Sequence, residues 1–227
     1  MTFSRHDEAG RPATRPDDLL LNHYDRCLRE HGDSAQGANW PDEEGRQLRH
    51  DVMLDVIREQ GPAVLCDFAC GTGELLAHAR KRALDVHYIG ADRSVEALRL
   101  ARQKFPGTAF IHIDVLTASD EELNRLVSDY IVINGLFTVR AGIGYDEMWR
   151  FLTEVVGRLW PRARRGIAFN VMSSHVDWER DDLFHVPFDR LAAFLHTFAG
   201  RNIVFRADYG LYEYTAYAFR PASVGKS

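Results

Sequence analysis

The sequence has little cysteine, and the three cysteines it has do not form a recognisable framework. Cys27, Cys66 and Cys70 are odd in number, and the Cys66–Cys70 spacing lacks a second ligand pair at zinc spacing. We therefore expect reduced, buried thiols and no metal site. Long apolar runs are also missing: none approaches the roughly 20 residues of a membrane-spanning helix. The polar N-terminus lacks the apolar stretch of a secretory signal, so we expect a cytoplasmic protein without a membrane partner.

Basic residues are in deficit as well. Lys and Arg number 28 against 33 Asp and Glu, which gives a net charge of −5. Proteins that bind a phosphate backbone normally carry a surplus of bases, so nucleic acid is a disfavoured partner. A local basic segment, residues 158–165, could form a patch, but its commoner interpretation is a solvated helix end.

The order of apolar runs predicts one α/β domain after a short tail. Residues 1–16 are rich in charge, proline and glycine, which is typical of a flexible tail. Residues 17–227 show no linker or repeat, and we divide them into N-terminal cap helices (17–60) and a core (63–227). Short apolar runs alternate with helical segments in this core and end in a hairpin. We therefore predict a Rossmann-like, doubly wound fold whose mostly parallel seven-stranded sheet has an antiparallel C-terminal strand.

The turn after the first predicted strand, Asp67-Phe-Ala-Cys-Gly71-Thr72-Gly73, has the features of a nucleotide site. Its glycines permit positive φ, and the start of the following helix favours an anion. The turn therefore suits either a dinucleotide pyrophosphate or the methionine carboxylate of S-adenosylmethionine. The dinucleotide fingerprint needs a small residue where this chain has Leu76. Asp67 would repel a pyrophosphate but can accept from a cationic amino group, which favours S-adenosylmethionine.

Acidic residues also end the next two predicted strands. Asp92 can accept from both hydroxyls of a ribose, which suits either cofactor. Asp114 can reach an adenine amino group, although a helix cap or turn former is about as good an interpretation of that residue alone. Together with the glycine turn, these acids predict a nucleoside site.

Over residues 64–134 the chain resembles class I S-adenosylmethionine-dependent methyltransferases, through the turn DxACGTG, the two acids and the strand YIVINGLF. Its flanks resemble a bacterial subgroup of small methyltransferases, at residues 29–32, Trp40, Glu44, Arg49, 168–170, 180–183 and 208–215. The resemblance implies S-adenosylmethionine as cofactor and S-adenosylhomocysteine as product, and it assigns no acceptor. We expect the cofactor to contact Asp67, Ala69, Gly71, Gly73, Asp92, Arg93, Asp114, Val115, Asn134 and Gly135. Arg49 either meets its carboxylate or lies on a solvated face.

The acceptor is predicted by exclusion. The fourth strand ends in Asn134-Gly135-Leu136-Phe137, not in the Asp/Asn-Pro-Pro-aromatic motif of enzymes that methylate nucleic-acid amino groups. The chain also lacks the Pro-Cys pair of cytosine C5 chemistry and the double-Glu loop of protein-arginine enzymes. The remaining interpretation is methyl transfer to an oxygen or nitrogen of a small metabolite.

Candidate catalytic residues are His175, Asp177, Tyr24 and His23. His175 follows the fifth predicted strand, where side chains face the ligand crevice, and an imidazole suits a base near neutral pH. The alternatives are a surface histidine for His175, a turn cap for Asp177 and simple packing for Tyr24. Methyl transfer can also proceed by proximity alone, without a base.

Three other functions stay open. The chain could be a non-catalytic S-adenosylmethionine-binding partner subunit, which the missing obvious base favours weakly. A nicotinamide-dependent oxidoreductase is disfavoured by Leu76 and Asp67. Aminopropyl transfer would require a second acidic pair after the fourth strand, which we do not find. The sequence leaves the oligomeric state open.

Overall fold

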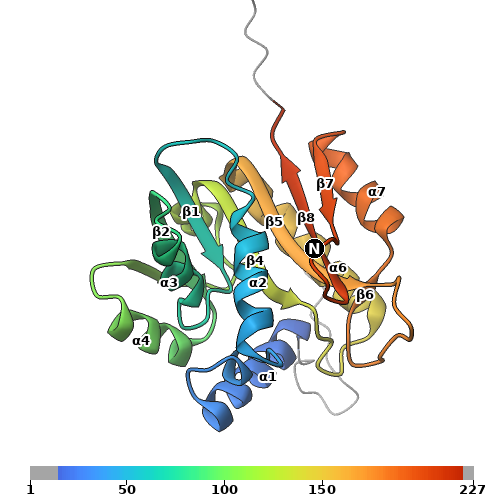
Figure 1. The fold of residues 1–227 in the computed structure, drawn as a ribbon, viewed down its shortest axis with the longest axis horizontal. Helices are drawn as coiled ribbons and strands as arrows, with labels where there is room; N and C mark the ends of the chain where they lie inside the picture. The colour runs from blue at the N-terminus through green and yellow to red at the C-terminus, as the bar shows by residue number, and fades with distance from the viewer. Residues whose placement is uncertain (1–14, 222–227) are drawn as a thin grey trace, which may run out of the picture.

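A central sheet with helices on both faces forms the protein (Figure 1), in a computed structural model that describes residues 15–221. Most of the predicted tail lies outside the described residues. Its last residue, Pro16, already begins helix α1, because proline fits the first turn of a helix.

The sheet has the strand order β3-β2-β1-β4-β5-β8-β7, and a short strand β6 pairs with β5 outside this path. Strands β1 to β6 pair in parallel, whereas β8 is antiparallel to both β5 and β7. The predicted fold class is therefore confirmed, with the two-residue β6 added to the seven expected strands. The strands are β1 (Ala63–Phe68), β2 (Val86–Asp92), β3 (Ala109–His112), β4 (Ser128–Phe137), β5 (Ala163–Ser173), β6 (His185–Val186), β7 (Ile203–Arg206) and β8 (Glu213–Phe219).

Three of the helices, α2, α4 and α5, begin at a side-chain cap. Ser94 accepts from the N–H of Ala97 at the start of α4, and Ser119 forms a capping box with Glu122 at α5. The helices are α1 (Pro16–His31), α2 (Glu43–Leu54), α3 (Glu74–Lys81), α4 (Val95–Lys104), α5 (Asp120–Leu123), α6 (Tyr145–Leu159) and α7 (Phe188–Ala199), with 3₁₀ turns at Gln36–Ala38, Asn124–Leu126 and Trp160–Arg162.

The core lies on both sides of the sheet. Along β4, Ile131 and Ile133 pack into a cluster with α6 and α7, whereas Tyr130 and Val132 pack into a cluster with α2, α3 and α4. Successive strand residues point to opposite faces, and a strand buried on both faces is apolar throughout. This explains why YIVI reads as a continuous apolar run.

The carboxyl ends of the parallel strands meet at one edge of the sheet, where α1 lies across them (Figure 1). In open α/β sheets, ligands bind at this edge, where the strand order reverses. Here the order reverses between β1 and β4. Within residues 15–221, no helix combines the length and apolar character needed to cross a bilayer.

Candidate functional site

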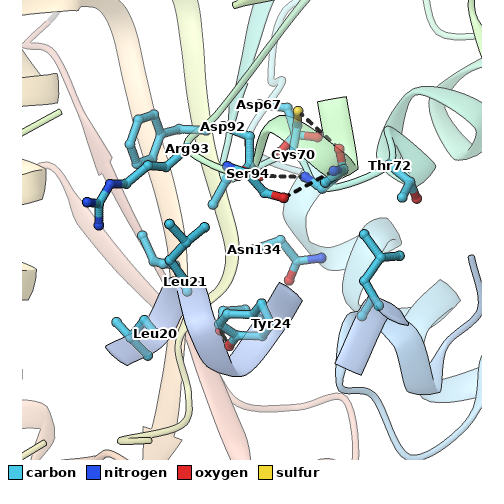
Figure 2. Close-up of a pocket in the computed structure, with 18 of the residues that line it drawn as sticks. Leu20, Leu21, Tyr24, Asp67, Cys70, Thr72, Asp92, Arg93, Ser94 and Asn134 are labelled. Atoms are coloured by element: carbon cyan, nitrogen blue, oxygen red, sulfur yellow. Dashed lines mark hydrogen bonds between the residues drawn. The ribbon is translucent and has the colours of Figure 1, made fainter. Parts of the chain in front are cut away.

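The first cavity lies between the carboxyl ends of β1 to β4 and the overlying helix α1 (Figure 2). Its wall contains all of the predicted cofactor residues except Gly73 and Arg49. Figure 2 shows Asn134 between the glycine turn on one side and Tyr24 of α1 on the other. Leu20 and Leu21 line the same space from α1.

The glycine turn has left-handed backbone at three of its residues: Ala69 (φ 61°), Gly71 (φ 54°) and Gly73 (φ 83°). A Cβ on Gly71 would meet no atom within 4 Å, so its backbone is open to a ligand. A Cβ on Gly73 would lie 3.0 Å from the ring of Phe105 and 3.3 Å from that of Phe110. Gly73 therefore serves packing between the turn and two aromatic rings, and it is not part of the cavity wall.

Asp92 at the end of β2 fixes the turn. Its two carboxylate oxygens accept from the N–H groups of Gly71 (2.8 Å) and Ser94 (2.7 Å). Burial raises the pKa of Asp92 despite these bonds. Since each carboxylate oxygen can accept more than one hydrogen bond, Asp92 can also receive the two hydroxyls of a ribose.

Asp67 at the end of β1 is only 2% exposed and accepts from the hydroxyl of Tyr88 at 2.6 Å. Burial raises the pKa of Asp67 to about 7, and the negative charge of Asp92 adds to this effect. With this pKa, Asp67 is only partly ionised near pH 7. A positive charge beside it would stabilise the ionised carboxylate, so the position favours a cationic ligand group.

Two buried polar atoms in the cavity wall have no hydrogen-bond partner among the described residues. They are Oδ1 of Asn134, an acceptor, and Nε of Arg46, a donor. Arg46 also pairs with Glu74 through a terminal nitrogen, at 3.3 Å. His50, one helical turn after Arg46, lines the same cavity, and burial lowers its pKa to about 3. Unpaired buried polar atoms are rare, so the acceptor and donor together fit a zwitterionic ligand group.

The structure places Arg49 outside this cavity, in contrast to the prediction. Its Nε and a terminal nitrogen each lie 2.8 Å from Oε2 of Glu213, and its guanidinium lies 4.3 Å from the centre of the Trp40 ring. Three residues earlier on α2, Arg46 takes the expected place. A spacing of three residues turns the side chain by about 60° around a helix, so the two arginines face different neighbours.

Asp114 and Arg93 line the cavity as predicted, but Asp114 is already engaged. Its Oδ2 accepts from Arg15 and lies 3.4 Å from Nε of Arg93, and its Oδ1 accepts from the N–H of Leu116. Burial alone would raise the pKa of Asp114, but the two arginines outweigh it and lower the pKa. An adenine amino group would therefore share this carboxylate with Arg15.

The predicted catalytic residues separate in space. Tyr24 lines the first cavity and donates to the carbonyl of Gly135 at 2.8 Å; burial raises its pKa, so the phenol stays protonated and positions the end of β4. His175 is exposed and lies outside both the first cavity and the hollow described next, with its ring stacked on Phe188 at 5.5 Å. It does not face the crevice, since the chain turns away after β5 ends.

A second hollow adjoins the first, and Asp177 and His23 line it. Among the described residues, Trp40 is the one side chain that lines both spaces. Trp40 is 9% exposed and lies against Gly135, where a Cβ would be 2.6 Å from the indole. The boundary between the two spaces is therefore the contact of Trp40 with the end of β4.

The comparisons with known proteins agree on one family. A family model described as a methyltransferase domain matches residues 66–164. The chain is 30% identical over 164 residues to the provisionally named methyltransferase Rv1506c of Mycobacterium tuberculosis (strain ATCC 25618 / H37Rv). This match covers 71% of the chain and 96% of that relative.

Solved structures share the fold at low sequence identity. The magnesium protoporphyrin IX methyltransferase ChlM of Synechocystis PCC 6803, solved with bound S-adenosylmethionine, has a TM-score of 0.60 at 16% identity, over 91% of this chain and 95% of that one. The 1,6-didemethyltoxoflavin-N1-methyltransferase of Burkholderia thailandensis, solved with 1,6-didemethyltoxoflavin and S-adenosylhomocysteine, has a TM-score of 0.61 at 16% identity, over 92% of each chain.

Proposed function

The chain belongs to the class I S-adenosylmethionine-dependent methyltransferases, and from this premise we propose that its first cavity binds the methyl donor for transfer to an oxygen or nitrogen of a small molecule. The observation that carries the proposal is the pair of unpartnered atoms, Asn134 Oδ1 and Arg46 Nε. They offer an acceptor and a donor to the ammonium and carboxylate of a methionine group.

The remaining wall residues complete this assignment. Asp67 accepts from the ammonium beside Asn134, and Arg46 donates to the carboxylate. Asp92 accepts from the ribose hydroxyls while it holds the turn at Gly71. Asp67, Asp92 and Arg46 all line the first cavity, and a carboxylate oxygen that already accepts one hydrogen bond can accept another.

Methyl transfer mainly requires the protein to position the methyl donor and the acceptor. S-adenosylmethionine supplies a methyl carbon on a sulfonium group, which leaves as a neutral thioether without acid assistance. With its methionine group held by Asp67, Asn134 and Arg46 and its ribose by Asp92, the donor would offer that carbon to a lone pair of the acceptor; the electron pair of the carbon–sulfur bond would stay on sulfur and the proton of the acceptor would go to solvent. Tyr24 and Trp40 support this step by holding the end of β4 and by excluding water at the boundary of the two spaces.

The proposal of a small-molecule acceptor has two supports. The sequence lacks the motifs of enzymes that methylate nucleic acids or protein arginines. Two of the structural neighbours carry small molecules in their names, a magnesium porphyrin and a toxoflavin precursor.

Titration calorimetry with S-adenosylhomocysteine tests the cofactor assignment. We expect binding by the wild type, and a loss of about tenfold or more in affinity for Arg46→Ala and Asp92→Asn, because each removes a charge-assisted hydrogen bond. The matched control is Arg99→Ala, which removes an exposed arginine of α4 that is not part of the cavity wall. No binding by folded wild type would contradict the proposal.

Transfer of a labelled methyl group separates an enzyme from a non-catalytic partner subunit. The wild type is incubated with labelled S-adenosylmethionine and a pool of small phenols and amines. We expect label in the acceptor pool, and about tenfold less when Asp92→Asn replaces the wild type at a cofactor concentration below saturation. Binding of the cofactor without transfer to any pool would favour the partner-subunit alternative.

A further inference from the structure

The second hollow lies beside the first cavity, and residues 23–49 and 138–142 line it together with residues 172–213. Its floor contains Met172 at the end of β5 and Glu213 at the start of β8, which are paired neighbours in the antiparallel ladder. The loops that extend from these two strands, residues 174–184 and 207–212, therefore rise side by side. Trp40 lines both the hollow and the cofactor cavity.

Two exposed aromatic side chains stand in these loops. Among the described residues, Trp178 is 72% exposed and Tyr212 64% exposed, the two highest values for large aromatic side chains. Both line the second hollow. Exposing an indole and a phenol in water is unfavourable, and exposed apolar side chains that gather in one concave place mark a binding surface.

The two arginines of the hollow are already neutralised, and Asp177 adds a negative charge to its wall. Arg49 is bound by the buried carboxylate of Glu213, and Arg180 makes two hydrogen bonds to the carboxylate of Asp182, at 2.9 and 2.6 Å. Both arginines line the hollow, but neither offers an uncompensated positive charge. Phosphorylated or multiply anionic acceptors therefore fit poorly here.

The end of the hollow beside Trp40 is polar, and Arg49, whose guanidinium lies over the Trp40 ring, is paired there with Glu213. His23 and Asn39 lie there beside Trp40, and the His23 ring packs edge-on against Tyr24 at 5.3 Å, next to the cofactor cavity. Burial lowers the pKa of His23, so its imidazole is neutral near pH 7. Neutral donors and acceptors at this end suit the hydroxyl or amine of a neutral ring.

We propose that the second hollow is the acceptor site and that it selects a planar aromatic or heteroaromatic molecule. The ring stacks against Trp178 and Tyr212, and a ring-bound hydroxyl or amine points to His23 and Asn39 at the Trp40 boundary. Aromatic rings stack on one another with a defined plane, which orients the nucleophile. This inference rests on the proposed function, because it needs the methyl donor in the first cavity.

The test uses matched pairs of probes that differ only in aromaticity. Binding of phenol and resorcinol is measured by saturation-transfer NMR in the presence of S-adenosylhomocysteine, against cyclohexanol and cyclohexane-1,3-diol, which are uncharged like the aromatic probes. We expect the aromatic probes to bind about tenfold more tightly than the saturated ones. Trp178→Ala and Tyr212→Ala should each weaken the aromatic probes by about fivefold or more, with Trp178→Phe close to wild type.

Two controls keep the result interpretable. Val204→Ala removes another exposed apolar side chain, on β7 and outside the hollow, and should leave probe binding unchanged. Calorimetry with S-adenosylhomocysteine should give the wild-type affinity for Trp178→Ala, which separates this inference from the cofactor assignment. Failure of that ligand to bind the wild type would refute the proposed function itself.

Three results would overturn the inference while the cofactor still binds. The first is equal affinity for the aromatic and saturated probes. The second is the absence of aromatic binding at about 10 mM, where even small ligands with one good contact are detectable. The third is a dimer in sedimentation that dissociates in Trp178→Ala, which would show that these aromatic side chains cover a second copy of the chain.

Discussion

Replacing Gly135 by alanine probes the boundary between the two spaces. Gly135 has φ 89°, where an L-residue pays roughly 1–2 kcal/mol. Its new Cβ would lie 2.6 and 2.8 Å from two carbons of the Trp40 indole, well inside the 3.5–4.0 Å of an ordinary carbon contact. Overpacking of this kind costs about 1–3 kcal/mol, so the free energy of unfolding should fall by about 2–5 kcal/mol in total.

Gly107→Ala is the matched control. Gly107 has φ 84°, and a Cβ there would meet no atom within 4 Å. This variant therefore pays the backbone cost alone, about 1–2 kcal/mol. Urea unfolding followed by circular dichroism measures both variants, and the difference between them reports the overlap with Trp40.

A double mutant isolates the contact further. Trp40→Ala removes a buried ring and is costly alone, but it also removes the overlap with the new methyl group. We expect Trp40→Ala and Gly135→Ala together to cost about 1–3 kcal/mol less than the sum of the single changes. Additive costs, or Gly135→Ala within about 0.5 kcal/mol of Gly107→Ala, would refute the reasoning.

Three further predictions concern charge. The pKa of Asp67 is raised to about 7, and a bound ammonium group favours the ionised carboxylate. As the pH is increased toward 7, the affinity for S-adenosylhomocysteine in calorimetry should therefore increase by up to about tenfold per pH unit, and above pH 7 it should level off. A pH-independent affinity would contradict this. The pKa of His50 falls from 6.5 to about 3 on folding, so stability that is present above pH 6.5 is lost as the pH falls toward 3. In urea titrations, the free energy of unfolding of His50→Gln should therefore decrease less steeply over this pH range than that of the wild type. Equal pH slopes for the two proteins would count against this prediction. Arg15→Ala removes the partly exposed ion pair between Arg15 and Asp114, and about 0.5 M salt weakens this pair in the wild type. Each change should therefore increase the dissociation rate of S-adenosylhomocysteine severalfold in stopped flow. Unchanged rates would exclude a role for the pair in retaining the ligand.

The fold and the centre of the cofactor cavity follow from local sequence signals. Ser94 caps α4 by accepting from the N–H of Ala97, and a cap of this kind acts within three residues of sequence. Asp67, Gly71 and Asp92 stand directly at strand ends, and parallel strands bring their carboxyl ends to one edge whatever the loops do. Such residues can be placed before any tertiary contact is known.

The residues beyond this centre depend on contacts between distant parts of the chain. Arg46 and Arg49 lie on one helix with the same side-chain chemistry, and their partners separate their roles: Glu43 and Glu74 for Arg46, and Glu213 for Arg49. His175 follows β5 like a crevice residue, but its ring stacks on Phe188 of α7. The strand β6 is two residues long and carries no periodic signal of its own. Sequence periodicity contains none of this information.

The exposed aromatic side chains of the second hollow lie in a part of the chain that the first cavity does not use, which bears on engineering. The wall of the first cavity ends at Phe151, whereas the exposed aromatic side chains of the second hollow stand in loops after residue 172. Loops from relatives could therefore be grafted at residues 174–184 and 207–212 while the first 150 residues are kept. A library built in this way would vary the molecule that is modified and conserve the reagent that modifies it, with Trp40 as the single position to vary together with both.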